Sequence, residues 1–269
     1  MNKSTVSEKS MDIKEKSKSL NKNLILYELR NIAGNPFVHV FGVLLPIFLS
    51  FIITKAAAAE ISEKSLPGAA TSIVISMSLL IPMATILIGH TSTYSQETEK
   101  GISQRMSLFR YEERTIFMAK AIAELIYMTI AFIIYAIMEN FLLDIQTPEA
   151  SSVLCLIICL YLISAIFYVL STGIVNFVGK FGPSYAISMS LYFLFMMLCG
   201  MMGIKTEQLP KVLKIASKLL PMSYISNDFG EFWQGGSYNF VPMIQAFLFF
   251  GAVSGIVFYL SVYKKKKFI

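Results

Sequence analysis

Charged residues are scarce in this chain of 269 residues. They make up 15% of the sequence, and 55% of the residues are apolar, whereas soluble proteins carry about 25% charged residues. Most of the charges also lie between long uncharged runs. This distribution excludes an ordinary soluble domain and is typical of a protein that crosses a membrane several times.

Residues that ligate metals or act as nucleophiles are also few. The chain has three cysteines and two histidines. Cys155, Cys159 and Cys199 lie in apolar runs with no histidine or acid nearby in sequence, so we expect them to pack as small apolar side chains. His39 and His90 each stand alone at the end of an apolar run. The sequence therefore predicts no metal site and no catalytic thiol.

A loop that binds nucleotide phosphates is missing as well. Such a loop has a glycine five residues before its Gly-Lys pair and a serine or threonine after it. At Gly179-Lys180 these two positions are occupied by Ile174 and Phe181. We therefore expect that the chain has no ATPase site and no cofactor of its own.

The first 36 residues lack the short apolar run and cleavage site of a secretory signal. They are polar and basic, so residues 1–36 are expected to form a retained tail whose first part is disordered. In residues 20–33 the apolar side chains share one stripe, which predicts an interfacial helix that ends just before Pro36. The stripe consists of Ile25, Leu29 and Ile32.

Long apolar runs are abundant. A helix needs about 20 apolar residues to cross a membrane, and six stretches qualify. They predict an all-α membrane protein with six transmembrane helices, and no strand-like alternation that would indicate a barrel is present. The stretches are Phe37–Thr54, Thr71–Thr93, Ala119–Met138, Val153–Val175, Tyr185–Gly203 and Val241–Tyr263. We treat residues 37–263 as the membrane domain and residues 264–269 as a basic tail.

Lysine and arginine are distributed unevenly between the two sides of these spans. If the N-terminus is cytoplasmic, 17 of the 23 lysines and arginines lie inside. Because loops rich in these residues stay in the cytoplasm, both termini are predicted to be cytoplasmic. The net charge of +6 then indicates contact with anionic membrane lipids. Nothing separate indicates nucleic-acid binding.

A strongly charged segment, residues 94–118, separates the second and third apolar runs. Within it Ile102, Met106 and Phe109 recur at the spacing of one helix face. This pattern predicts an inner surface helix that contacts the membrane or a partner. The alternative is an ordinary solvated loop.

Ionisable residues at membrane depth are uncommon and often functional. Only Lys120 and Glu124 meet this description in the sequence. They are four residues apart on one face of the third span, so we interpret them as a structural ion pair that extends toward the lipid headgroups.

The longest outer segment, residues 204–240, also has a pattern. Its apolar residues recur one helical turn apart, with lysines on the opposite face, which predicts an amphipathic outer helix between spans five and six. Pro210 and Pro221 bracket this helix. The aromatic and acidic residues that follow it are expected at the headgroup level, with substrate contact as the alternative. These residues are Asp228, Phe229, Glu231, Phe232 and Trp233.

The order of these features resembles the membrane subunits of type-2 ATP-binding-cassette (ABC) exporters. In that family a basic interfacial helix leads through a proline into the first span, as in YELRNIAGNPF here. The second span is followed by Glu-x-Glu-x-Gly, a short helix and a basic residue, matched by Glu97, Glu99, Gly101 and Lys120. A Leu-Pro, an amphipathic run and a Pro-x-x-Tyr precede the sixth span, matched by Leu209, Pro210, Pro221 and Tyr224. One departure is that a proline usual in the inner segment is missing from LFRYEER.

The resemblance implies the permease half of an exporter in a bacterial plasma membrane. Two six-helix subunits, this chain and a second copy or a related permease, face each other, and separate ABC ATPase subunits bind the ATP. An inner helix over Glu97–Arg114 would receive the motion of the ATPase. The implied ATPase-coupling residues are Glu97, Glu99, Gly101, Ile102, Arg105, Met106 and Phe109.

Two other functions stay open from the sequence. A membrane-bound immunity or receptor protein would bind a toxic peptide without transport, using the same outer segment. An intramembrane enzyme would need a buried catalytic constellation, for which only Lys120 and Glu124 are available. If the chain is a permease, its methionine-rich fifth span favours an amphiphilic substrate: an antimicrobial peptide, a lipid-like compound or a drug. These methionines are Met196, Met197, Met201 and Met202.

Overall fold

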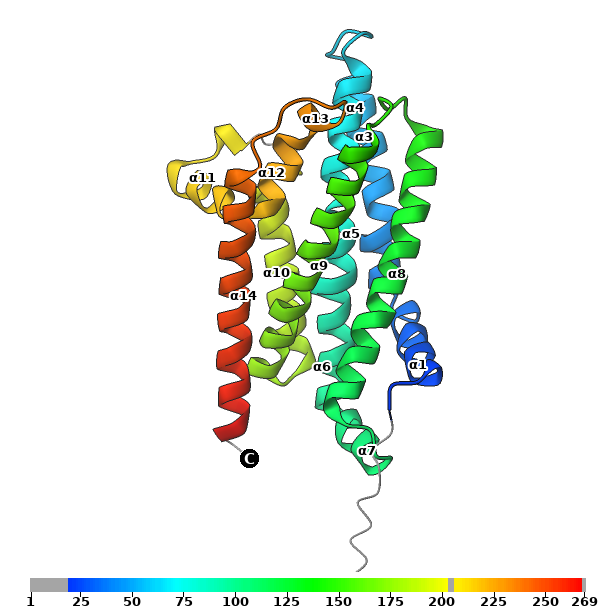
Figure 1. Cartoon of the computed structure of the whole chain (residues 1–269), viewed down its shortest axis with the longest axis vertical. Coiled ribbons are helices and arrows are strands. Elements are labelled where there is room, and N and C mark those ends of the chain that lie inside the picture. Colours follow the sequence, from blue (N-terminus) through cyan, green and yellow to red (C-terminus); the bar gives the residue numbers. More distant parts are fainter. Residues whose placement is uncertain (1–18, 203–205, 268–269) are drawn as a thin grey trace, which may run out of the picture.

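The computed structural model describes residues 19–202 and 206–267. In this part of the chain, six helices are long and apolar enough to cross a membrane. They stand side by side as a bundle, with short helices at both ends (Figure 1). The predicted all-α architecture with six spans is confirmed.

Two of the spans, the first and the second, are built from more than one helical segment. The first span comprises α2 (Pro36–His39), η1 (Val40–Leu44) and α3 (Leu45–Ala57). The second comprises α4 (Leu66–Ser78), α5 (Leu80–Pro82), η2 (Met83–His90) and α6 (Thr91–Glu99). The remaining spans are α8 (Glu113–Leu142), α9 (Ala150–Val178), α10 (Phe181–Leu198) and α14 (Val241–Lys267).

Most span boundaries differ from the sequence prediction by a few residues. The second span runs from Leu66 to Glu99 rather than from Thr71 to Thr93. The third span begins at Glu113 rather than Ala119, because its charged first turns continue the same helix. The fifth span begins at Phe181 rather than Tyr185. It can do so because Gly179 ends α9 in the left-handed region, with φ of 70°, and the chain reverses within two residues. Gly203, the predicted end of the fifth span, lies outside the described residues.

The second span is the centre of the bundle. In its most apolar window 83% of the residues are buried, against 22–44% in the other five spans. Leu79, Leu80, Ile81 and Met83 have no exposed surface. Four of the other spans pack against this one, and the sixth, α14, packs against α9. The outward faces of these five spans are left for lipid or protein contact.

The two segments η1 and η2 are π-helical and pack against each other. Glycines allow this close approach. A Cβ atom on Gly89 would lie 2.8 Å from Cγ2 of Val38, and one on Gly42 would lie 3.0 Å from Cγ2 of Thr85. The first and second spans thus meet through small residues at a stretch where neither is a regular α-helix.

The short helices divide between the two ends of the bundle (Figure 1). At one end, here called the α7 end, lie α1 (Lys22–Ala33), α7 (Ile102–Leu108) and the C-terminal end of α14. The opposite end, called the α11 end, carries α11 (Lys211–Lys218), α12 (Pro221–Asn227) and α13 (Phe229–Phe232), preceded by η3 (Thr206–Gln208).

Two amphipathic helices expected from the sequence are present. Helix α1 packs along α8 and begins at Asn21, whose side chain accepts a hydrogen bond from the Leu24 amide at 2.9 Å. Helix α11 is shorter than the predicted run, because Pro221 already begins α12. Val212 and Ile215 of α11 are 77% and 64% exposed. Residues 204 and 205 of the outer segment are outside the described part.

Candidate functional site

A buried ion cluster joins three helices near the α7 end. Nζ of Lys120, on α8, donates to Oε2 of Glu28 on α1 at 2.6 Å and to the Glu97 carboxylate on α6 at 2.7 Å. The amide of Asn31 donates to the same Glu97 carboxylate at 2.8 Å. None of the three charged side chains is more than 5% exposed. We refer to Glu28, Asn31, Glu97 and Lys120 as the Lys120 cluster.

The charges of the Lys120 cluster do not balance when both carboxyl groups are ionised. Burial raises the pKa of Glu28 to about 7. The positive charge of Lys120 opposes this rise in pKa, and the negative charge of Glu97 adds to it. The raised pKa favours a protonated Glu28, and the protonated cluster is electrically neutral.

This pKa predicts a pH-dependent stability. The folded pKa of Glu28 lies above the unfolded value of 4.5. The contribution of Glu28 to the free energy of unfolding is therefore complete below about pH 4.5 and is lost as the pH rises through about 7. We expect Glu28→Gln, which mimics the protonated acid, to remove about 2–3 kcal/mol of this pH-dependent change in the free energy of unfolding. Unfolding in mixed micelles between pH 4.5 and 8.5 measures it.

The control for this experiment is Glu60→Gln, because Glu60 is exposed at the other end of the bundle. The free energy of unfolding of that variant should depend on pH as it does in the unchanged protein. Parallel pH profiles for Glu28→Gln and the unchanged protein would contradict the assignment.

A second buried group lies next to the Lys120 cluster. Nδ1 of His90 is 2.7 Å from Oε1 of Glu124, and Nε2 is 3.0 Å from the Thr172 hydroxyl. That hydroxyl donates its own hydrogen to the Tyr168 carbonyl, so Nε2 must be the donor to Thr172. Nδ1 of His90 joins the ring to the Glu124 carboxyl group, and the two side chains form a buried pair. This pair connects the second, third and fourth spans.

The predicted ion pair of Lys120 with Glu124 is therefore wrong in its partners. Lys120 binds Glu28 and Glu97, and Glu124 binds His90. Neither side chain extends toward the headgroups, since each residue is 2% exposed. Lys120 and Glu124 do not pair within α8, because the neighbouring helices supply buried partners for both side chains.

The predicted inner helix over Glu97–Arg114 is interrupted. Gly101 has a φ of 65° and separates α6 from α7. Glu97 and Glu99 thus belong to the second span and have internal partners. Oε2 of Glu99 accepts a hydrogen bond from the Phe181 amide at 2.8 Å, at the start of α10. Glu97 is buried in the Lys120 cluster, whereas Glu99 is exposed and also holds the start of α10.

The remaining predicted coupling residues lie on or beside α7. Ile102 and Met106 are half-buried against the bundle. Arg105 is exposed and donates to the Lys100 carbonyl at 2.6 Å, while Phe109 is 66% exposed. Leu108, which the sequence pattern did not single out, is 81% exposed. The outward surface, here called the α7 face, consists of Arg105, Leu108 and Phe109.

Two turns and a cavity surround α7. Arg110 has a φ of 69° and makes the turn after α7, in the stretch where the family's usual proline is missing. A cavity of about 500 Å³ lies between α7 and the Lys120 cluster. Glu97, Lys120 and Asn176 are among the residues that line it. The helix thus projects from the bundle without filling the space behind it.

Glu28 is the main residue that the sequence interpretation missed. Leu24, Glu28 and Ile32 are spaced by four, and all three are buried. A carboxylate in the middle of a buried stripe is a detectable signal, because it requires a partner. His90 gave no such signal, since its partners are 34 and 82 residues away in the chain.

Within residues 19–202 and 206–267, no group of three or more His, Cys, Asp or Glu side chains could hold a metal ion. Cys159 and Cys199 are buried free thiols, and Cys155 is half-buried. The polar residues at the α7 end therefore form helix-joining contacts.

Comparison with known families agrees with this arrangement. The family model described as ABC-2 type transporter matches residues 20–229, from the start of α1 to α13. A search of curated proteins finds none that matches the chain. The matched region covers most of the sequence and includes five of the six spans, the Lys120 cluster and α7. The chain therefore belongs to the ABC-2 type transporter family, as a multi-pass permease subunit of a type-2 ABC transporter.

Proposed function

We propose that this permease is half of an ATP-driven exporter in a bacterial plasma membrane. It works with a separate ABC ATPase subunit and pairs with a second copy of itself or a related permease. Its cargo is an amphiphile, such as an antimicrobial peptide, a lipid-like compound or a drug. Family membership supports the transport role, because members of this family form the membrane component of ABC transporters.

The observation that carries the ATPase coupling is the α7 face and its connections to the spans. Leu108 and Phe109 project from the bundle with large exposed apolar surfaces, as expected for anchors that fill a partner's pocket. Helix α7 follows directly on α6, which is fixed to α8 and α1 by the Lys120 cluster and to α10 by Glu99. A movement of α7 would therefore be transmitted to the second, third and fifth spans.

The α7 end is proposed to be cytoplasmic. Twelve described lysines and arginines lie at that end, and such residues accumulate on the cytoplasmic side. In intact cells an impermeant thiol reagent should label Ser237→Cys at the α11 end and leave Ser107→Cys unlabelled; labelling of Ser107→Cys would contradict this orientation. The twelve residues are Lys22, Arg30, Lys100, Arg105, Arg110, Arg114, Lys120, Lys180 and Lys264–Lys267.

Reconstitution tests the transport function. Vesicles with the permease alone should neither hydrolyse ATP nor move an amphiphilic substrate, and adding the cognate ABC ATPase should give both activities. An immunity or receptor protein would instead bind a toxic peptide and retain no ATPase through purification. Transport by the permease alone, or no ATPase bound to the purified complex, would contradict the proposal.

A further inference from the structure

A cavity of about 620 Å³ opens between α4, α8 and α9, toward the α11 end. Exposed Ile133, Ile137 and Ile157 border it, so its mouth faces the surface that lipid covers in a membrane. Trp233, the only tryptophan of the chain, lies in its wall. The cavity is far from α7 and takes no part in the coupling contacts described above.

Glu139 of α8 is the unusual residue of this cavity wall. It has no exposed surface. Its Oε1 accepts a hydrogen bond from the hydroxyl of Ser50 on α3, and its Oε2 has no hydrogen-bond partner in the described part of the chain. No described cation forms an ion pair with Glu139. A buried carboxyl group in this state calls for a cation or a hydrogen-bond donor.

Three buried polar side chains around the cavity already have partners, and Asn140 is exposed at its edge. The Tyr135 hydroxyl donates to the Val74 carbonyl at 2.9 Å, and the Ser78 hydroxyl donates to the Ile75 carbonyl at 2.6 Å. The Trp233 indole donates to the Gln146 carbonyl at 2.9 Å. The free oxygen of Glu139 is therefore the strongest acceptor left for a ligand.

We propose that this cavity binds a long-chain amphiphile whose protonated amine is held by Glu139. Glu139 is three residues from the end of α8, so the amine would lie near the membrane boundary. The cavity wall continues along α8 to Thr129, about 15 Å away at 1.5 Å per residue, and an alkyl chain fits along this length. This binding site depends on the proposed function in one respect, that such an amphiphile is the transported substrate.

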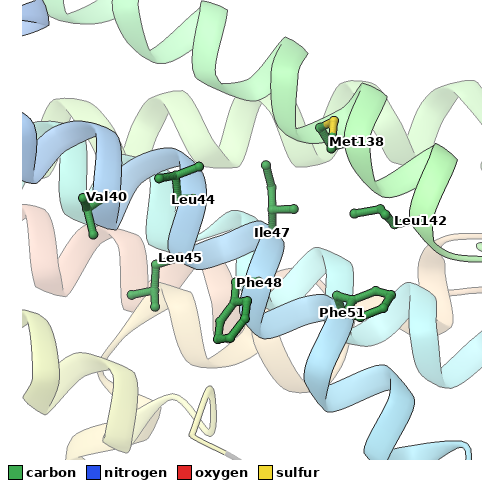
Figure 2. Close-up of a pocket in the computed structure, with 8 residues that line it drawn as sticks. All are labelled: Val40, Leu44, Leu45, Ile47, Phe48, Phe51, Met138 and Leu142. Carbon is green, nitrogen blue, oxygen red and sulfur yellow. The ribbon is translucent and has the colours of Figure 1, made fainter.

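A second groove is wholly apolar, and comparison with it shows why Glu139 would make the first cavity selective for amines. Figure 2 shows Met138 and Leu142 of α8 facing Ile47 and Phe51 of the first span across this groove. Its volume is about 500 Å³, and every residue that lines it is apolar. Such a groove suits any lipid tail, whereas the cavity beside Glu139 distinguishes an amine from other headgroups.

Trp233 allows the binding test to be made without an ATPase. The purified permease in phosphatidylcholine nanodiscs is titrated with dodecylamine, and the fluorescence of Trp233 is recorded. We expect a saturable change, with affinity lowered at least about tenfold by Glu139→Gln, because a charge-assisted hydrogen bond is lost. The exposed control Glu60→Gln should bind as the unchanged protein does. Dodecanoic acid, which carries the opposite charge, should give no saturable change.

A second variant guards against a folding defect in Glu139→Gln. Ala136 lines the cavity, and Ala136→Phe fills it while Glu139 is retained, so this variant should also weaken dodecylamine binding. The melting temperature of each variant reports its fold. Equal dodecylamine affinity in the unchanged protein and in folded samples of both variants would overturn the proposal.

The lipid composition of the nanodisc identifies the source of the amine. If phosphatidylethanolamine weakens dodecylamine binding, the site takes the amine of a membrane lipid. If it has no effect, the site prefers a free amphiphile. Because no ATPase is present, failure of dodecylamine to bind refutes this site alone, whereas failure of the reconstituted complex to transport refutes the proposed function.

Discussion

Replacing Lys120 with methionine is expected to destabilise the α7 end of the bundle by about 3–5 kcal/mol. The substitution keeps most of the side-chain volume but leaves Glu28 and Glu97 buried with no positive charge. Unfolding in mixed micelles measures the loss, and protease cleavage between α1 and α2 should report release of α1 from α8.

Two further variants separate charge from packing in this prediction. Lys100→Met removes a lysine that is exposed, and it should change the free energy of unfolding by less than about 0.5 kcal/mol. Adding Glu28→Gln and Glu97→Gln to Lys120→Met removes the unpaired carboxylates and should recover most of the lost stability. A triple variant as unstable as Lys120→Met would show that Lys120 acts through packing.

Changing both Leu108 and Phe109 to serine is expected to abolish ATP-driven transport without affecting the fold. These side chains are 81% and 66% exposed, so their loss should alter the free energy of unfolding by less than about 0.5 kcal/mol. As interface anchors they should together contribute at least about 2 kcal/mol, which lowers ATPase binding more than tenfold. Co-purification of the ATPase and transport in vesicles are the measurements.

Helix α11 supplies a matched control for this pair. Val212 and Ile215 are similarly exposed, at 77% and 64%, but lie at the opposite end of the bundle. Changing both to serine should leave ATPase binding unaltered. Equal losses of ATPase binding in the two double variants would mean that apolar exposure in general, and not the α7 face, is responsible.

The six spans could be predicted because their signal is local. A run of about 20 apolar residues identifies a membrane helix whatever surrounds it. The ends of the spans shifted by a few residues, because polar turns continue several of the helices. Helix α1 could also be predicted, because its apolar stripe is a local signal too. The order of short motifs around these spans was enough to indicate the family, which the match over residues 20–229 confirms.

The partners of the charged residues could not be predicted, because they depend on tertiary packing. Lys120 and Glu28 are 92 residues apart in the chain, and no pattern in the sequence pairs them. Glu97 illustrates the consequence. As a docking residue it would tolerate Glu97→Lys without loss of stability, but in the Lys120 cluster that change places two ammonium groups together. Its effect on transport would thus be indirect.

The π-helical segment η2 makes the length of the second span as important as its composition. A π-helical turn accommodates an additional residue compared with an α-helical turn. Deleting one residue from Met83–His90 would allow this stretch to become regular α-helix while Glu97 and Glu99 keep their orientation. An insertion has no such turn to absorb it and would rotate everything after it by about 100°, so that Glu97 would face away from Lys120 and Glu99 away from α10. A single deletion in this stretch should therefore be tolerated better than a single insertion.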